Sequence, residues 1–491
     1  MDRTLRVVVF SFLFASFGFA QKITQPVELG IVATDDHGDA VEGLTASDFS
    51  TTCGGKSVTP IVKAEPTLAP APPARERDSN KGFAAARRGL TVLVLDTLHT
   101  RADQESNIRT NIAKFISDAA AKNQPVTLLQ LSPSGLRMIY EFGASDPSAN
   151  AARMEAFMKG SGINAGYTDS KMHAYPEAVL NMFYTVGQAN RGIPGRKALV
   201  WFTNIVPLEI DRKSKLLVSP VSVGQGASVL GDAMPTKQTL LGDKELRELN
   251  ASWKRAINAL VTTQTVVIPV ELRGASQSGS ISETLSAMKD LAVLTGGREI
   301  HGSNNPLANL EHVLRPPTTY TVTIPSDAPC AREFCELTVS AHRAANTLAP
   351  QGIFRQDSLS PIPQAEQLSR ALNSPLNFQE LGFAVEMSVA DHKLSFRTAL
   401  EPSSGVIDTT SSSVSVEVGL NVLLPDGTSK QKASFNAAGT LPPEAVKQIT
   451  ENGMNVKGAI ELPPGEYDLK FVVHDKLHDR YGSVVIHKKI A

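Results

Sequence analysis

Four short runs of apolar residues constrain the fold of this chain more than any other feature of its sequence. They are Leu90–Leu95, Val126–Leu131, Ala198–Phe202 and Val266–Val270. None shows the polar alternation of a half-exposed strand, so both faces of each predicted strand must be covered. Segments with helical spacing of apolar residues separate or follow these runs, at 108–119, 246–260 and 280–291. This order predicts a largely parallel, doubly wound α/β sheet within residues 89–314.

The rest of the chain predicts a multidomain protein, because 491 residues exceed what one ordinary hydrophobic core accommodates. Alternating apolar residues predict a small β domain at 21–64, and a Pro/Ala-rich and charged linker follows at 65–88. Residues 315–360 are expected to form a β-hairpin extension that contains a cysteine loop. Strands that alternate polar and apolar side chains predict a C-terminal β-sandwich at 375–491, of roughly immunoglobulin-like size.

The N-terminus has the pattern of a secretory signal peptide. Arg3 and Arg6 precede an apolar run from Val7 to Phe17, and small residues follow at Gly18 and Ala20. Cleavage after Ala20 is predicted, so residues 1–20 are the signal peptide and the mature chain is secreted or periplasmic. A membrane anchor is the alternative, although this apolar run is shorter than a usual bilayer span of about 20 residues.

Three cysteines are present, and export makes a disulfide permissible. Cys330 and Cys335 flank four residues between two strand-like segments, so a disulfide between them would close a hairpin loop. Free thiols are the alternative. Cys53 then has no partner within the chain, and its state is left open.

Composition and motifs argue against several classes of function. The formal net charge of −1 gives no overall field that would attract nucleic acid. The sequence contains no Gly-x-Ser-x-Gly, His-Glu-x-x-His or phosphate-binding loop. His474 and His478 flank Asp475 at a spacing that would suit zinc on a helix, but the neighbouring residues predict strand, turn and strand. No enzyme activity, and no cofactor, is expected.

In an open α/β sheet, ligands bind outside the carboxyl ends of the strands, where this chain has Asp96 and Asn204. Several motifs here resemble the von Willebrand factor A fold, in particular the related proteins of acidobacteria. These motifs are Val41–Leu44, Asp48–Phe49, Val92–Asp96, Gly195–Val200, Leu294–Gly297 and Pro464–Tyr467. The resemblance covers most of the chain, and it implies an exported protein with an A-like domain.

The same resemblance implies a Mg²⁺ site built from an Asp-x-Ser-x-Ser loop, a Thr from a second loop and a later Asp. Asp96 and Thr100 match this pattern, whereas Leu98 replaces a serine and Asn204 stands where the later Asp is expected. Thr168 is the candidate for the remaining Thr. With one carboxylate left, the alternatives are weak Mg²⁺ binding and a degenerate site that keeps only the fold.

We therefore expect an exported protein-binding or adhesion-type module whose partners are proteins of the cell envelope or extracellular space. The loops of the A-like domain, including the long segment 205–243, would contact the partner. Two alternatives are a cryptic hydrolase centred on Asp96 and His99, and a passive envelope scaffold. The sequence does not identify the partner, the biological process or the oligomeric state.

Overall fold

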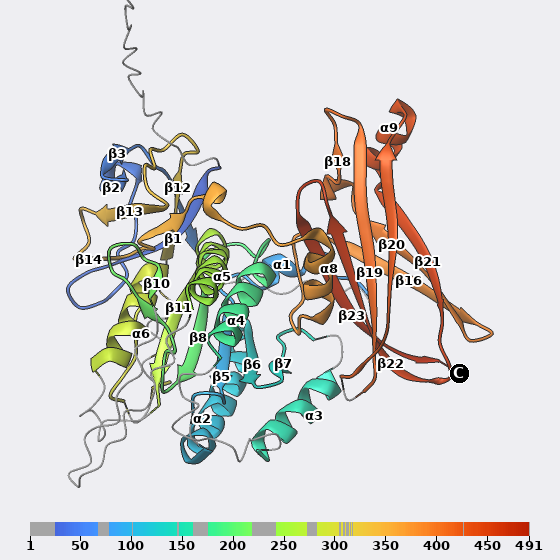
Figure 1. Ribbon diagram of the computed structural model, residues 1–491, viewed down its shortest axis with the longest axis horizontal. Coiled ribbons are helices and arrows are strands. Elements are labelled where there is room, and N and C mark those ends of the chain that lie inside the picture. The colour runs from blue at the N-terminus through green and yellow to red at the C-terminus, as the bar shows by residue number, and fades with distance from the viewer. Residues whose placement is uncertain are drawn as a thin grey trace, which may run out of the picture.

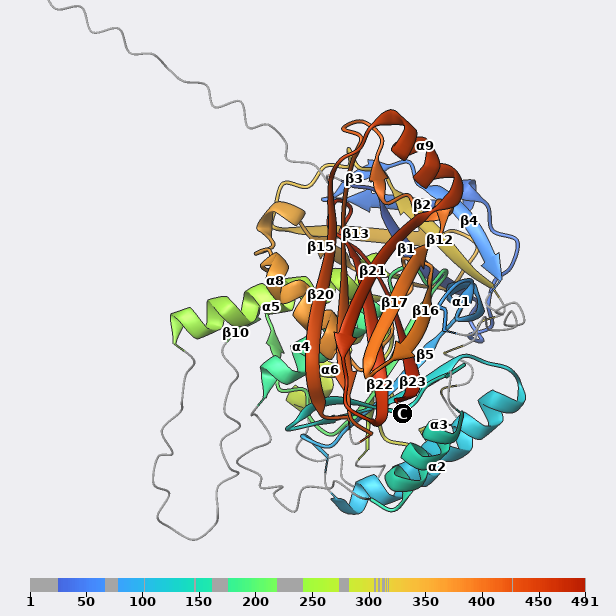
Figure 2. The same ribbon diagram turned by 90° about the vertical axis from the view of Figure 1, so that its right-hand side faces the viewer.

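The computed structural model describes residues 25–66, 78–100, 102–144, 147–160, 175–218, 242–272, 282–303, 306–307, 310, 314, 316, 318–425 and 427–490. The predicted signal peptide, Thr168 and the middle of the segment 205–243 lie outside these residues. The chain is multidomain and rich in strands, as predicted. Figures 1 and 2 show the C-terminal strands on one side of the molecule and the central sheet, with the N-terminal strands, on the other.

The central sheet contains the four apolar runs. Its strands are β5 (Thr91–Asp96), β6 (Val126–Ser132), β7 (Gly135–Tyr140), β8 (Lys197–Thr203) and β11 (Thr265–Glu271). The strand order is β11-β8-β5-β6-β7, and all neighbours are parallel except β6 and β7. The carboxyl ends of β5, β6, β8 and β11 therefore lie along one edge of the sheet, which we call the strand-end edge.

Alternate side chains of each parallel strand enter two different cores, which explains why the strands are apolar throughout. Val92 and Val94 pack with α4 (Pro176–Ala189), α5 (Asp243–Thr262) and α6 (Ser282–Thr295). Leu93 and Leu95 pack with α2 (Ala102–Ala121) and with Phe157 of α3 (Pro147–Met158). The described residues thus cover both faces of the sheet with helices, as Figure 1 shows.

The two β segments that flank the central sheet in sequence pair with each other. The first segment contains β1 (Val27–Thr34), β2 (Phe49–Cys53), β3 (Lys56–Val58) and β4 (Ile61–Pro66). The second contains β12 (Thr318–Ile324), β13 (Phe334–Ala341), β14 (Asn346–Leu348) and β15 (Gly352–Phe354). They form two sheets, in the orders β14-β1-β12-β4 and β15-β13-β2-β3. Residues 21–64 and 315–360 were predicted as separate units, whereas their strands pair with each other in these sheets.

Tyr320 on β12 illustrates how the two segments are joined. Its side chain is buried, and its hydroxyl donates a hydrogen bond to the Val41 carbonyl at 2.8 Å and accepts one from the Leu44 amide at 3.2 Å. Its ring packs against Phe49 at a centroid distance of 5.4 Å. These contacts fix the loop between β1 and β2 on a strand that is far away in the chain.

Residues 383–490 form two further sheets that share one core. The first contains β16 (Phe383–Ala390), β17 (Lys393–Leu400) and β21 (Met454–Glu461). The second contains β18 (Ile407–Asp408), β19 (Ser413–Leu423), β20 (Ser429–Thr440), β22 (Gly465–Asp475) and β23 (Arg480–Ile490). Apolar residues from both, such as Phe396 and Phe471 with centroids 5.0 Å apart, meet in that core.

Other short elements of the described chain include α1 (Phe83–Ala86), α9 (Pro443–Asn452), β9 (Glu209–Ile210) and β10 (Leu217–Val218). The last two pair as a hairpin. None of the described helices combines the length and apolar character needed to cross a membrane.

Helix α8 (Gln364–Asn373) links the central domain to the C-terminal strands. Leu368, Ala371 and Leu372 are buried in the same core as α4 and α5. The helix also contacts β19 and β22, and a Cβ at Gly419 of β19 would lie 3.1 Å from the side chains of Leu368 and Leu372.

Lys470 on β22 holds the carboxyl end of α8. Its buried ammonium group donates hydrogen bonds to the carbonyls of Ser374 and Leu376, the latter at 3.2 Å. Burial lowers the pKa of Lys470 to about 7, because desolvation disfavours the charged form. In an unfolded chain, the pKa of a lysine is about 10.4.

We predict that Lys470→Met flattens the dependence of stability on pH. Between pH 7 and about 10, the unfolded chain keeps a proton on Lys470 that the folded chain has released, so the free energy of unfolding rises with pH. Urea unfolding from pH 7 to 9.5 measures this slope. Lys457→Met, at an exposed position on β21, is the control and should leave the slope unchanged. Equal slopes in wild type and Lys470→Met would contradict the assignment.

Candidate functional site

The strand-end edge brings together polar side chains from three neighbouring strands. Asp96 ends β5, Asn204 directly follows β8, and Glu271 ends β11. The strand registers pair Leu95 with Phe202 and Glu271 with Thr203. Two of the predicted site residues, Asp96 and Asn204, therefore lie at one edge, and Glu271 was not predicted there.

The carboxylate of Asp96 is buried and accepts five hydrogen bonds. The amides of Leu98 and His99 donate to Oδ1, at 3.0 and 3.2 Å. Oδ2 lies 2.7 Å from His99 Nδ1, and it accepts from Trp201 Nε1 and Thr203 Oγ1, both at 3.1 Å. Asp96 and His99 both have a relative exposure of 0%. A carboxylate offers about four lone-pair positions, so these donors saturate it.

The residues at this edge do not fit the Mg²⁺ ion that the von Willebrand factor A resemblance implies. The ion would need a free carboxylate oxygen on Asp96, where His99, Trp201 and Thr203 are already bound. The buried Oγ1 of Thr100 and Oδ1 of Asn204 lack hydrogen-bond partners among the described residues, but both are neutral ligands. Within the described part of the chain, no three His, Cys, Asp or Glu side chains are grouped to hold a metal.

Two further contacts fix the surroundings of Asp96. The Asn204 amide nitrogen donates to Oε1 of Gln104 on α2. Glu105 and Arg109, one turn apart on the same helix, form a buried ion pair at 2.9 Å. Burial, and to a smaller extent the charge of Asp96, raises the pKa of Glu105, while Arg109 opposes that shift. The loop Asp96–Thr100 is thus held between β8 and α2.

The buried position of His99 bears on the predicted hydrolase alternative. A general base must come within hydrogen-bond distance of its substrate, directly or through one water. With 0% exposure, the His99 imidazole does not reach solvent in this conformation. In this conformation the Asp96–His99 contact holds the loop against β5.

The histidines near the C-terminus lie in a strand, a turn and a strand. β22 ends at Asp475 and β23 begins at Arg480. Asp475 is buried and binds His478 Nδ1 and Arg480, each at 2.7 Å, while His474 stacks on Tyr481 at 4.2 Å. These contacts stabilise the turn.

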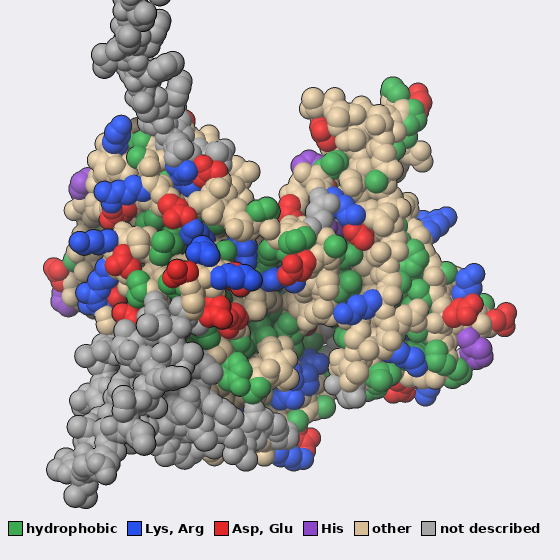
Figure 3. Space-filling view, in the orientation of Figure 1, with side chains coloured by type: hydrophobic (Ala, Val, Ile, Leu, Met, Phe, Trp, Pro, Cys, Tyr) green, Lys and Arg blue, Asp and Glu red, His purple; other side chains and the backbone are tan. Residues whose placement is uncertain are grey.

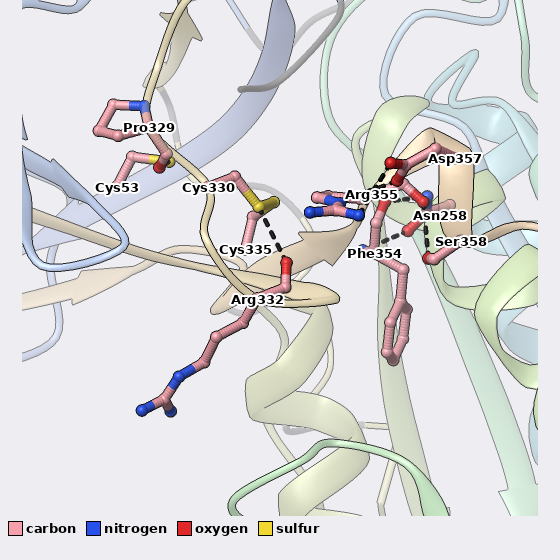
Figure 4. The surroundings of a disulfide bond; sticks show 10 residues. All are labelled: Cys53, Asn258, Pro329, Cys330, Arg332, Cys335, Phe354, Arg355, Asp357 and Ser358. Carbon is pink, nitrogen blue, oxygen red and sulfur yellow. Dashed lines mark hydrogen bonds and ion pairs between the residues drawn. A yellow bond between two sulfur atoms is a disulfide. The ribbon is translucent and has the colours of Figure 1, made fainter. Parts of the chain in front are cut away.

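Cys330 and Cys335 form a disulfide, with their Cα atoms 5.3 Å apart. Figure 4 shows that bond, with Cys53 separate from it beside Pro329. The Cys53 thiol is buried and donates a hydrogen bond to the Pro329 carbonyl at 3.1 Å. Burial raises the pKa of this thiol, so little reactive thiolate forms at neutral pH.

The sequence analysis missed Trp201 and Thr203, the two side chains of β8 that bind Asp96. The sequence does place these polar atoms at the end of an otherwise apolar strand, where they face the end of a parallel neighbour. Predicting their contact with Asp96 also requires knowing that β5 pairs with β8.

No family model matches the chain, and no curated protein matches it significantly. Several solved structures are similar in part. The N-terminal domain of TFIIH p34 has 10% identity and a TM-score of 0.26, over 46% of this chain and 95% of that one. A mutant of the PilB minor pilin from Streptococcus sanguinis has 16% identity and a TM-score of 0.26, over 46% and 58%. The ArnB paralog VWA2 from Sulfolobus acidocaldarius has 8% identity and a TM-score of 0.22, over 90% and 76%.

We predict that Asp96→Ala lowers the free energy of unfolding by about 3 kcal/mol, because it leaves several buried donors without an acceptor. Asp36→Ala, in an exposed turn, is the control and should have little effect on the free energy of unfolding.

The midpoint of thermal unfolding of the wild type should not change when millimolar Mg²⁺ replaces a chelator. A Mg²⁺-dependent rise in the unfolding midpoint that Asp96→Ala removes would contradict this account of the site.

A second prediction concerns the thiols. Without a reductant, we expect iodoacetamide to label no cysteine of the folded protein and one cysteine, Cys53, after unfolding in denaturant. Reduction in denaturant should expose all three. Peptide mass mapping identifies the labelled positions, and rapid labelling of Cys330 or Cys335 in the unreduced protein would disprove the disulfide.

Proposed function

We propose that this chain is an exported protein-binding or adhesion-type module of the acidobacterial von Willebrand factor A-related kind. In this proposal, a signal peptide at 1–20 directs it to the periplasm or the cell exterior. A doubly wound A-like domain recognises the partner, and a C-terminal β-sandwich and the N-terminal strands act as spacers or secondary contacts. The partner is a protein of the envelope or extracellular space.

The hydrogen bonding of Asp96 is the observation that carries the proposal. A carboxylate that accepts five hydrogen bonds holds the loop Asp96–Thr100 in one conformation. A rigid loop loses little conformational entropy on binding, which favours recognition of a partner. The same saturation favours a degenerate site that binds its partner without a bridging metal ion.

Exposed residues at the strand-end edge are the proposed points of contact. Pro133 follows β6 and is exposed, and so is His301, next to Ile300, which forms a bridge with Val270. Both lie beyond the carboxyl ends of parallel strands, where ligands of open α/β sheets bind.

The test compares two single charges placed at opposite ends of β6. We predict that mature wild-type chain, residues 21–491, captures a partner from native envelope extract and that Pro133→Lys weakens this capture about tenfold or more, as expected for an unpaired charge in an interface. Gln124→Lys, just before the amino end of β6, adds the same charge and should not affect capture. Quantitative mass spectrometry of the captured proteins gives the ratio.

Three results would count against this proposal. Equal capture by Pro133→Lys and wild type would place the contact elsewhere. No partner for any form would favour the passive scaffold. A turnover detected in a broad substrate screen, and abolished by His99→Ala in a folded variant, would favour the hydrolase.

A further inference from the structure

A cleft lies between the central domain and the C-terminal strands, and the turn between β6 and β7 borders it. Figure 3 shows the surface hollowed between these two parts of the molecule. Two cavities, of about 460 and 780 Å³, occupy the cleft. They adjoin, because Tyr184, Gln188, Gln367 and Asp479 line both. Ligand sites in proteins usually measure about 300–1,000 Å³, so each cavity is large enough for a ligand group.

The smaller cavity is formed by α4 on one side and by α8 and the C-terminal strands on the other. Its lining includes the apolar or aromatic side chains of Met182, Phe378 and Tyr481. Arg370 and Asp479 are the charged residues in its lining, and the Arg370 guanidinium lies 5.9 Å from the centre of the Tyr184 ring. An apolar or aromatic group would fit this cavity.

In the larger cavity, most carboxylates already face a cation. Glu65 binds Lys63 at 3.3 Å and Arg88 at 2.8 Å. Arg191 binds Glu380 at 3.1 Å and Asp479 at 3.6 Å. These acidic groups therefore offer little attraction for a cationic ligand.

Arg255 differs from the other arginines of the cleft. It lines the larger cavity and donates hydrogen bonds to two neutral groups, the Ser360 carbonyl and the Ser252 hydroxyl, both at 3.0 Å. Among the described residues, the hydrogen-bond partners of Arg255 are these neutral groups. Burial, and next the like charge of Arg370, lowers the pKa of Arg255. Arg370 already binds Glu366 at 2.7 Å, so an anion beside Arg255 would supply the partner that Arg255 lacks.

From these contacts we infer that the cleft binds an acidic peptide segment. A carboxylate of the peptide would pair with Arg255, and an adjacent apolar side chain would enter the smaller cavity beside Phe378. The side-chain amides of Gln188 and Gln367, at the junction of the cavities, can pair with peptide groups of the backbone. This site differs from the proposed contact for the envelope partner, although Ser134, next to Pro133, lines the smaller cavity.

Fluorescence polarisation with labelled peptides tests the inference. The probes are a hexapeptide of alternating Phe and Glu, and matched peptides with Gln or Lys in place of Glu, added to the mature chain. We expect the Phe-Glu peptide to bind at least tenfold more tightly than either of the others. Arg255→Ala should weaken its binding about tenfold, a change of about 1.4 kcal/mol. Arg247→Ala is the matched control, because Arg247 is exposed on the same helix and outside both cavity linings.

Equal thermal unfolding midpoints of the variants show that each has folded. Equal affinity for the three peptides, no binding of the Phe-Glu peptide, or undiminished binding by Arg255→Ala would overturn the inference. A peptide of alternating Ala and Glu that binds as well as Phe-Glu would also overturn it, because the smaller cavity would then have no role. Arg255→Ala should keep full capture of the envelope partner, so failure of this site is distinguishable from failure of the strand-end edge.

Discussion

The buried carboxylate of Asp96 is the interaction on which the arrangement of the central domain depends. A carboxylate without exposure is costly to desolvate unless hydrogen bonds replace its hydration. Here the replacement comes from the following loop and from Trp201 and Thr203 of the adjacent strand. The charge therefore requires β5 and β8 to be parallel neighbours with their ends aligned. A von Willebrand factor A-type metal site would use the same carboxylate, and in this chain protein donors take the place that the ion would need.

In the sequence, the central domain is inserted between the two β segments that form the flanking sheets. Strands β1 and β4 come before the sheet, and β12, which pairs with both, comes after it. The chain leaves this unit after Pro66 and returns at Thr318, so the ends of the central domain are held close together. That closure links the stability of the flanking strands to that of the central domain. It also explains why Tyr320, buried under the loop between β1 and β2, belongs to the same core as α4 and α5.

Local patterns in the sequence located strands and helices well. They did not predict which strands pair when those strands are far apart in the chain. The run Leu90–Leu95 is β5 shifted by one residue, and the apolar spacing at 246–260 lies within α5, Asp243–Thr262. Helix α8 was not predicted although Leu368, Ala371 and Leu372 have helical spacing, because the stretch that contains it is polar and includes Pro361 and Pro363. Nothing in residues 27–66 alone indicates pairing with residues 318–354. The hydrogen bonds of Asp96 likewise depend on strand order, which one sequence does not reveal.

The two candidate sites differ in their electrostatics, and this difference separates their roles. At the strand-end edge, Asp96 and the Glu105–Arg109 pair are buried and bound to other protein groups, so they rigidify loops without presenting charge to a partner. In the cleft, Arg255 remains partly exposed and faces neutral groups, so its charge is available to an anion. Helix α8 connects the two parts that line the cleft, and Lys470 anchors its end through backbone carbonyls. Because this anchor is buried rather than a surface ion pair, salt screens it little, whereas a ligand held by Arg255 should bind more weakly as ionic strength rises.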